Sequence, residues 1–108
     1  METEELSEKI QLTIGKAADQ VKASIDPEAA QLYSQSVLQL AYQKAPYGFL
    51  KPGDEVFDKI NSALARTLDQ CRAATDAKKS MLWSQAGTNL TNAKAVLDGS
   101  KQGTSVKK

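Results

Sequence analysis

The sequence predicts an all-α domain, and three observations support this prediction. Apolar residues recur at spacings of three and four along most of the chain, which is the period of an amphipathic helix. An Asp-Pro-Glu sequence at 26–28 and a stretch rich in Pro and Gly at 46–53 divide this pattern into segments. The 108 residues, 41% of them hydrophobic, suffice for one core. We therefore expect an antiparallel four-helix bundle.

The first expected helix begins near Thr3 and extends to about residue 25. Three glutamates in its first turns favour the positive end of a helix. Gly15 lies off the apolar stripe, where it allows a neighbouring helix to approach closely. The stripe itself consists of Leu6, Ile10, Ile14, Ala17, Val21 and Ile25.

The second expected helix has the clearest start signal in the chain. Asp26 can accept hydrogen bonds from the first free amides, Pro27 suits the first helical position, and Glu28 favours the positive end. We expect this helix to end near Lys44. Its apolar stripe is wider than that of the first helix, so we expect it to contact more than one neighbour.

The segment 46–53 interrupts the helical pattern. Its two prolines and two glycines prevent a helix from passing through it. It nevertheless contains Tyr47, Phe49 and Leu50, which a solvated connection would not need. We expect either that these side chains fold back to cap the open end of the bundle, or that a partner protein covers them.

The third expected helix begins after Gly53 or Asp54, and its stripe continues towards the C-terminus without Gly or Pro until Gly87. One alternative is a single long C-terminal helix, giving three helices in an oligomer, because a monomer would leave half of that stripe uncovered. We favour a break around residues 75–80, where Ser80 would cap a fourth helix starting at Met81.

The end of the chain is expected to differ from the rest. Gly87 with the two residues after it is a possible further interruption, and the residues from Gly99 onwards show no periodicity. We expect a helical domain over 1–98 and a flexible basic tail over 99–108. We identify no internal repeat.

Composition excludes several classes of function. The chain has no histidine, so histidine-based catalysis and histidine metal sites are excluded, and we predict no catalytic residue, metal or cofactor. Its formal net charge is +1, and Asp69 and Asp76 are interleaved with its central basic residues, so we do not expect nucleic-acid binding. No apolar run is long enough to span a membrane. A single cysteine, Cys71, rules out an internal disulfide and favours a cytoplasmic location.

These exclusions favour a non-enzymatic protein–protein interaction module, such as an adaptor, inhibitor, immunity-type or assembly protein. It would present a helical face and the aromatic loop to another protein, and a homo-oligomer is one possible form of it. We expect Trp83 to flank the core; the alternative is that it protrudes as a binding anchor, since tryptophan is common at interface hot spots. The candidate partner-binding residues are Tyr47, Phe49, Leu50 and Trp83.

The alternative function is the binding of a small ligand, such as a nucleotide, in a groove between helices or protomers. Aromatic side chains could stack on such a ligand and basic side chains could balance its charge. The candidate residues for this alternative are Tyr33, Tyr42, Lys44 and Arg66. The sequence leaves the partner's identity and the oligomeric state open.

Overall fold

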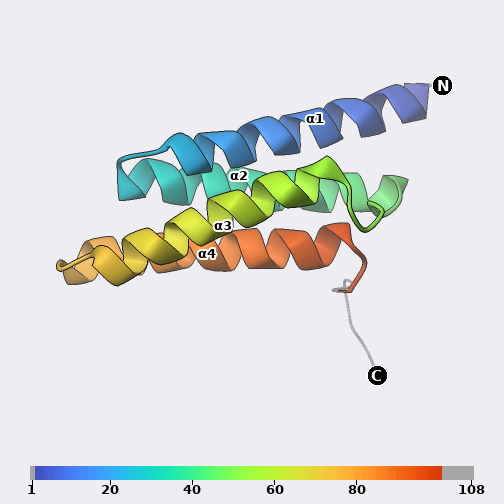
Figure 1. The fold of residues 1–108 in the computed structure, drawn as a ribbon. Coiled ribbons are helices and arrows are strands. Elements are labelled where there is room, and N and C mark those ends of the chain that lie inside the picture. Colours follow the sequence, from blue (N-terminus) through green and yellow to red (C-terminus); the bar gives the residue numbers. More distant parts are fainter. Residues whose placement is uncertain (1, 101–108) are drawn as a thin grey trace.

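The computed structural model describes residues 2–100, which form four α-helices (Figure 1). They are α1 (Glu2–Ala23), α2 (Pro27–Lys44), α3 (Glu55–Ala73) and α4 (Ala77–Leu97), and a 3₁₀ turn, η1 (Ala45–Tyr47), follows α2. The prediction of an all-α four-helix bundle is confirmed. Most of the expected basic tail, residues 101–108, lies outside the described residues.

The bundle consists of two antiparallel hairpins, one laid on the other. The first hairpin is α1 with α2, and the second is α3 with α4. Between the hairpins α1 packs on α3, and α2 packs on α4. Figure 1 shows that the helices of each of these pairs run in the same direction. The second hairpin is therefore placed like a translated copy of the first, as in stacked helical repeats.

The same short loop closes both hairpins. Three residues separate α1 from α2, and three separate α3 from α4. In each loop an aspartate in extended conformation caps the following helix: Asp26 accepts a hydrogen bond from the amide of Ala29 at 3.2 Å, and Asp76 accepts one from Lys79 at 3.3 Å. The predicted Asp26 cap is confirmed.

Several expectations for the second half are corrected. The chain does break between two helices, so the single long helix is wrong, but α4 begins at Ala77 rather than Met81 and its cap is Asp76 rather than Ser80. The aspartate lies closer to the end of α3 and closes a shorter loop. Gly87 does not interrupt α4, because it serves packing: a Cβ there would lie 3.2 Å from the Thr67 hydroxyl on α3.

The expectation that the chain has no internal repeat is also wrong. Aligning the two hairpins shows that residues 4–45 correspond to residues 54–95, at a constant offset of 50 positions. Many further pairs are conservative, such as Tyr33 with Trp83. The identical pairs are Glu5/Glu55, Lys9/Lys59, Ile10/Ile60, Asp19/Asp69, Gln20/Gln70, Ala23/Ala73, Asp26/Asp76, Leu32/Leu82, Ser34/Ser84, Gln35/Gln85, Leu40/Leu90, Lys44/Lys94 and Ala45/Ala95.

The core lies between the two hairpins and within each of them. It includes Ile14 and Val21 from α1, Val37 from α2, Ile60 from α3 and Leu90 from α4, all of them fully buried. Leu6 and Ile25 of the predicted first stripe do not join it, since they are 49% and 87% exposed, and Leu68 on α3 is 57% exposed. None of the helices in residues 2–100 combines the length and the apolar character needed to cross a bilayer.

Candidate functional site

The predicted aromatic loop covers one end of the bundle with only part of its apolar surface. Leu50 is buried, and its amide donates a 2.8 Å hydrogen bond to the carbonyl of Leu97 at the end of α4. Phe49 lies against Gly99, where a Cβ would approach its ring to 2.9 Å, yet Phe49 remains 51% exposed. Tyr47 is 39% exposed and lies beside the N-terminal part of α1.

Trp83 belongs to the hydrophobic core. Its side chain is 4% exposed, on α4. The structure therefore places Trp83 as a packing residue, and not as a protruding binding anchor. It does not lie with Tyr47 and Phe49 on one surface, because it is in the first turns of α4 while that loop covers the opposite end of the bundle.

The four residues of the ligand-binding alternative are not brought together. Lys44 is 4% exposed, and its ammonium group donates a 2.9 Å hydrogen bond to the carbonyl of Gly48. Arg66 donates a 3.0 Å hydrogen bond to the carbonyl of Ser24, at the other end of the bundle. Tyr33 and Tyr42 are exposed at different positions around α2. The two cations are thus engaged in holding the chain's own loops.

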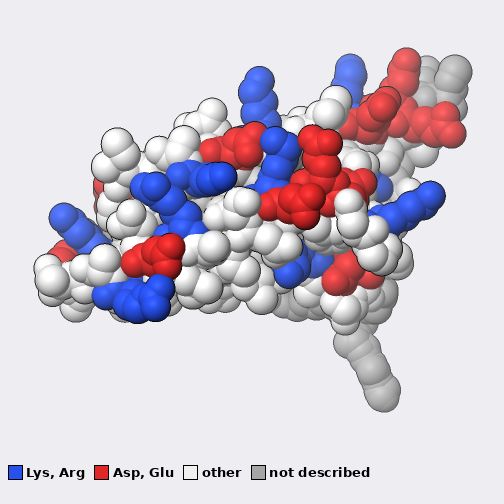
Figure 2. Space-filling view, viewed as in Figure 1, with Lys and Arg blue, Asp and Glu red and all other residues white. Residues whose placement is uncertain are grey.

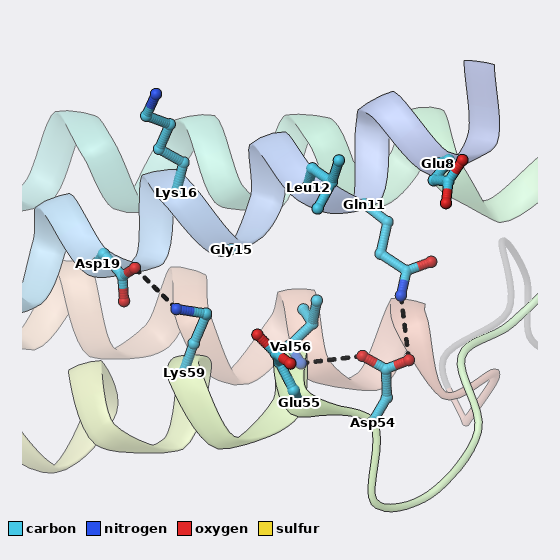
Figure 3. Close-up of a pocket in the computed structure, with 10 residues that line it drawn as sticks. All are labelled: Glu8, Gln11, Leu12, Gly15, Lys16, Asp19, Asp54, Glu55, Val56 and Lys59. Atoms are coloured by element: carbon cyan, nitrogen blue, oxygen red, sulfur yellow. Dashed lines mark hydrogen bonds and ion pairs between the residues drawn. The ribbon is translucent and has the colours of Figure 1, made fainter. Parts of the chain in front are cut away.

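The seam between the hairpins is built from polar contacts around a small-residue packing surface. Between α1 and α3, Lys59 forms an ion pair with Asp19 at 2.9 Å, and the amide group of Gln11 donates to Asp54 at 3.0 Å (Figure 3). The aliphatic part of Lys59 passes over Gly15, where a Cβ would lie only 3.2 Å from it. These contacts fix the position of the second hairpin along the axis of the first.

Two further hydrogen bonds cross the seam. Between α2 and α4, Asn89 donates to the hydroxyl of Ser34 at 3.0 Å, and Ser34 is fully buried. At the end of α1, Arg66 donates to the carbonyl of Ser24. Buried polar groups are costly unless paired, so these bonds select one register of the two hairpins.

Electrostatics strengthen one of the seam contacts. The hydrogen bond from Lys59 to Asp19, together with the negative charge of Asp19, raises the pKa of the Lys59 ammonium above the ordinary value of 10.5. The charged form is favoured because it is the form that donates and that attracts the carboxylate. The Lys59–Asp19 pair is therefore a salt bridge between the hairpins at neutral pH.

A wide concave surface lies on the first hairpin, on the side facing away from the second. We call it the outer groove; its volume is about 730 Å³. It follows the line between α1 and α2 and combines apolar and amide side chains. The lining residues are Thr13, Lys16, Ala17, Gln20, Leu32, Tyr33, Gln35, Ser36, Gln39, Leu40 and Gln43.

Six of the eleven residues that line the outer groove have counterparts in the second hairpin that are buried. Tyr33 is 40% exposed, but the corresponding Trp83 is 4% exposed; Ser36 is exposed, but the corresponding Ala86 is fully buried. The same holds for Thr13 and Gln43, which are exposed, while the corresponding Ala63 and Ala93 are fully buried. Ala17 and Leu40 are already half-buried and pack against the core, and their counterparts Thr67 and Leu90 are fully buried. The outer groove is thus the counterpart of the surface on which the second hairpin receives the first.

The side of the second hairpin that faces away from the first shows the converse relation. We call it the α3–α4 outer face, defined by Ala65, Leu68, Ser84 and Thr91, all exposed. The corresponding residues of the first hairpin are Gly15, Ala18, Ser34 and Ala41, and all four are buried. Each hairpin therefore has one side that is buried against the other hairpin and one side that is exposed to solvent.

Sequence reasoning missed this relation because it treated each helix separately. The signal was present in the second half of each hairpin's first helix, where Asp19-Gln20-Val21-Lys22-Ala23 matches Asp69-Gln70-Cys71-Arg72-Ala73. Aligning the chain with itself would have detected it.

Within residues 2–100 no group of three or more acidic, cysteine or histidine side chains is placed to hold a metal ion. Comparisons of the chain with protein-family models, with curated proteins and with solved structures find no match. The described residues form a stack of two related helical hairpins with a solvent-exposed surface on each outer side.

Proposed function

We propose that this protein is a non-enzymatic protein–protein interaction module whose outer groove binds a helical hairpin of another polypeptide chain. The observation that carries the proposal is the pair Tyr33 and Trp83. The two residues occupy corresponding positions, and the second is buried where the hairpins meet, whereas the first is open to solvent.

The character of the outer groove supports this proposal. Tyr33, Leu32 and Leu40 supply apolar contact area, and four glutamine side chains supply donors and acceptors along its length. Tyrosine gives large contact area at a low cost in side-chain entropy, which suits an interface. A partially apolar, concave surface rimmed by amides is typical of a specific but reversible interaction.

We keep the sequence-based prediction of an interaction module, but we assign the partner to a different surface of the protein. Within the aromatic loop, Leu50 is buried against the end of the bundle and Phe49 lies against Gly99. We therefore assign the partner to the helical face, and we assign to the loop the role of joining the two hairpins. A single cysteine, partly buried beside Ser80, fits a module that works in the reducing cytoplasm.

Site-specific photocrosslinking tests the proposal. A photoreactive phenylalanine derivative at Tyr33 lies in the outer groove, and the same residue at Tyr42 is a matched control, since Tyr42 is on the same helix, 47% exposed and outside the groove. We expect a defined protein adduct from position 33 in cells that express the chain, mapped to a helical segment of the partner. Equal crosslinking from both positions, or none from position 33, would contradict the proposal.

A further inference from the structure

The two exposed surfaces of the molecule, the outer groove and the α3–α4 outer face, are complementary to each other. The outer groove corresponds to the surface of the second hairpin that receives the first, and the α3–α4 outer face corresponds to the surface of the first hairpin that docks there. The seam within one chain therefore shows how the outer groove of one copy would receive the α3–α4 outer face of another.

We infer that the partner of the outer groove is a second copy of this chain, stacked head to tail so that the hairpins continue in one line. This inference rests on the proposed function and names its partner. Such a contact is heterologous, since different surfaces of the two copies meet, and it can be repeated from copy to copy. A stack of hairpins is the natural extension of a repeat architecture.

The Lys59–Asp19 salt bridge has a counterpart between copies. Lys9 corresponds to Lys59 and Asp69 corresponds to Asp19, with both residue types unchanged at the offset of 50. Lys9 is exposed on the first hairpin, and Asp69 is exposed on the second, where it forms a 2.8 Å ion pair with Arg72 of the same helix. Figure 2 shows basic side chains projecting from the α1 edge, away from the second hairpin. A docked copy would place Lys9 of one chain beside Asp69 of the next.

The hydrogen bond between Asn89 and Ser34 has a counterpart as well. Gln39 corresponds to Asn89 and lines the outer groove, and Ser84 corresponds to Ser34 on the α3–α4 outer face. Gln39 keeps the donating amide group of Asn89 on a side chain one methylene longer. Ser84 keeps the hydroxyl that accepts the bond in the seam.

The remaining two seam contacts are also preserved in chemistry. Lys16 corresponds to Arg66 and can donate to the carbonyl of Ala74, the counterpart of the Ser24 carbonyl that Arg66 uses. Asn61 corresponds to Gln11 and can donate to Glu4, the counterpart of Asp54. All four polar contacts of the seam thus find a competent donor and acceptor between copies.

The contact between copies also has apolar residues at positions that correspond to those of the seam. Tyr33 would take the place of Trp83, and Leu68, exposed at present, would take the place of the buried Ala18. Ala65, Ser84 and Thr91 stand where the first hairpin has Gly15, Ser34 and Ala41, so the facing helices would lie slightly further apart than in the seam. An exposed leucine at a position that is buried in the related hairpin is explained by such a contact.

The contact between copies lacks the connection that joins the two hairpins within one chain. The segment 48–54 ties α2 to α3, and a short linker of this kind raises the effective concentration of its ends to the millimolar range. We therefore expect stacking to be reversible and to grow with concentration, with a range of assembly sizes rather than one closed oligomer.

Sedimentation velocity of the full chain from about 10 µM to about 1 mM, a range set by the linker's effective concentration, tests the inference. We expect the average mass to rise continuously above 11.7 kDa. Tyr33→Asp disables the outer groove and Leu68→Asp disables the α3–α4 outer face; each is expected to weaken self-association about tenfold or more. Tyr42→Asp is the matched control and should associate like the unchanged chain. Circular dichroism melting of each variant verifies folding.

Mixing the two disabled variants identifies the geometry. The Leu68→Asp chain keeps its outer groove and the Tyr33→Asp chain keeps its α3–α4 outer face, so an equimolar mixture is expected to form a one-to-one dimer and nothing larger. Should Leu68→Asp leave association unchanged, or should the mixture stay monomeric while the unchanged chain associates, head-to-tail stacking is overturned.

The failure of this inference can be told apart from the failure of the proposed function. A chain that remains monomeric to about 1 mM overturns self-stacking. If position 33 then still crosslinks to a different protein, the interaction module stands with another partner. If position 33 crosslinks to nothing, both proposals fail.

Discussion

The two hairpins of this protein share caps, loop length and many residues, yet they use their corresponding surfaces differently. The surface around Trp83 is buried by the first hairpin, whereas the surface around Tyr33 is open. The difference follows from position in the stack, because each repeat can cover only one side of its neighbour. The change from Trp to Tyr at this position fits the difference, since tyrosine tolerates water better than tryptophan does.

The largest expected effect comes from truncating the two corresponding aromatic residues. Trp83→Ala is expected to lower the free energy of unfolding by about 3–5 kcal/mol, because it removes a large side chain from the core. Tyr33→Ala should cost less than about 1 kcal/mol in the dilute protein, where its outer face is solvated. Urea denaturation of both variants measures the difference, and equal losses would contradict the comparison.

The next effect concerns the linker, which has no counterpart between copies. Leu50→Ala is expected to cost about 2–4 kcal/mol, since Leu50 is buried and adjoins the end of α4. Replacing Tyr47 and Phe49 together should cost less, because both are well exposed. Thermal unfolding of the two variants checks this order. A larger loss from the double variant would show that the aromatic pair, rather than Leu50, anchors the linker.

The two hairpin loops should respond alike to loss of their caps. Asp26→Ala and Asp76→Ala each remove the side chain that accepts a hydrogen bond from the amide of the third residue of the following helix. Each is expected to cost about 1 kcal/mol. Denaturation midpoints measure both. A markedly larger effect at one loop would mean that the two loops, despite their shared geometry, are not equivalent.

A smaller effect is expected at the Lys59–Asp19 pair. The raised pKa of Lys59 means that its contribution to stability is fully present below the ordinary lysine pKa of 10.5 and is lost as the pH rises through the higher value of the folded state. Asp19→Asn should lower the pKa of Lys59, which NMR titration of its ammonium group can follow. An unchanged pKa in that variant would show that Asp19 is not the cause.

Local signals in the sequence predicted the helices well. Asp26 with Pro27, and the Pro and Gly residues of 46–53, act on the backbone of their own segments, so their effect does not depend on distant contacts. The first cap and the end of the second helix at Lys44 were therefore predicted correctly. The cap of α4 was misplaced because Asp76 and Ser80 are both good capping residues and the loop length was not known.

The neighbours of each helix could not be predicted in the same way. An apolar stripe shows that a helix face is covered but not which helix covers it. Gly87 illustrates the limit, since its isolated position in the sequence suggested an interruption, whereas the close approach of Thr67 explains it. The outer groove was missed for a related reason: it becomes meaningful only when Tyr33 is compared with Trp83.

The charge pair between copies provides the most direct test of the central claim, that the outer groove repeats the chemistry of the seam. Lys9→Glu and Asp69→Lys are each expected to weaken self-association severalfold, since each replaces an attraction between copies with a repulsion. The chain that carries both changes should associate like the unchanged protein, because the new carboxylate at position 9 of one copy then faces the new ammonium group at position 69 of the next. Sedimentation of the three variants measures this. Single variants without effect, or a double variant weaker than either, would contradict the account.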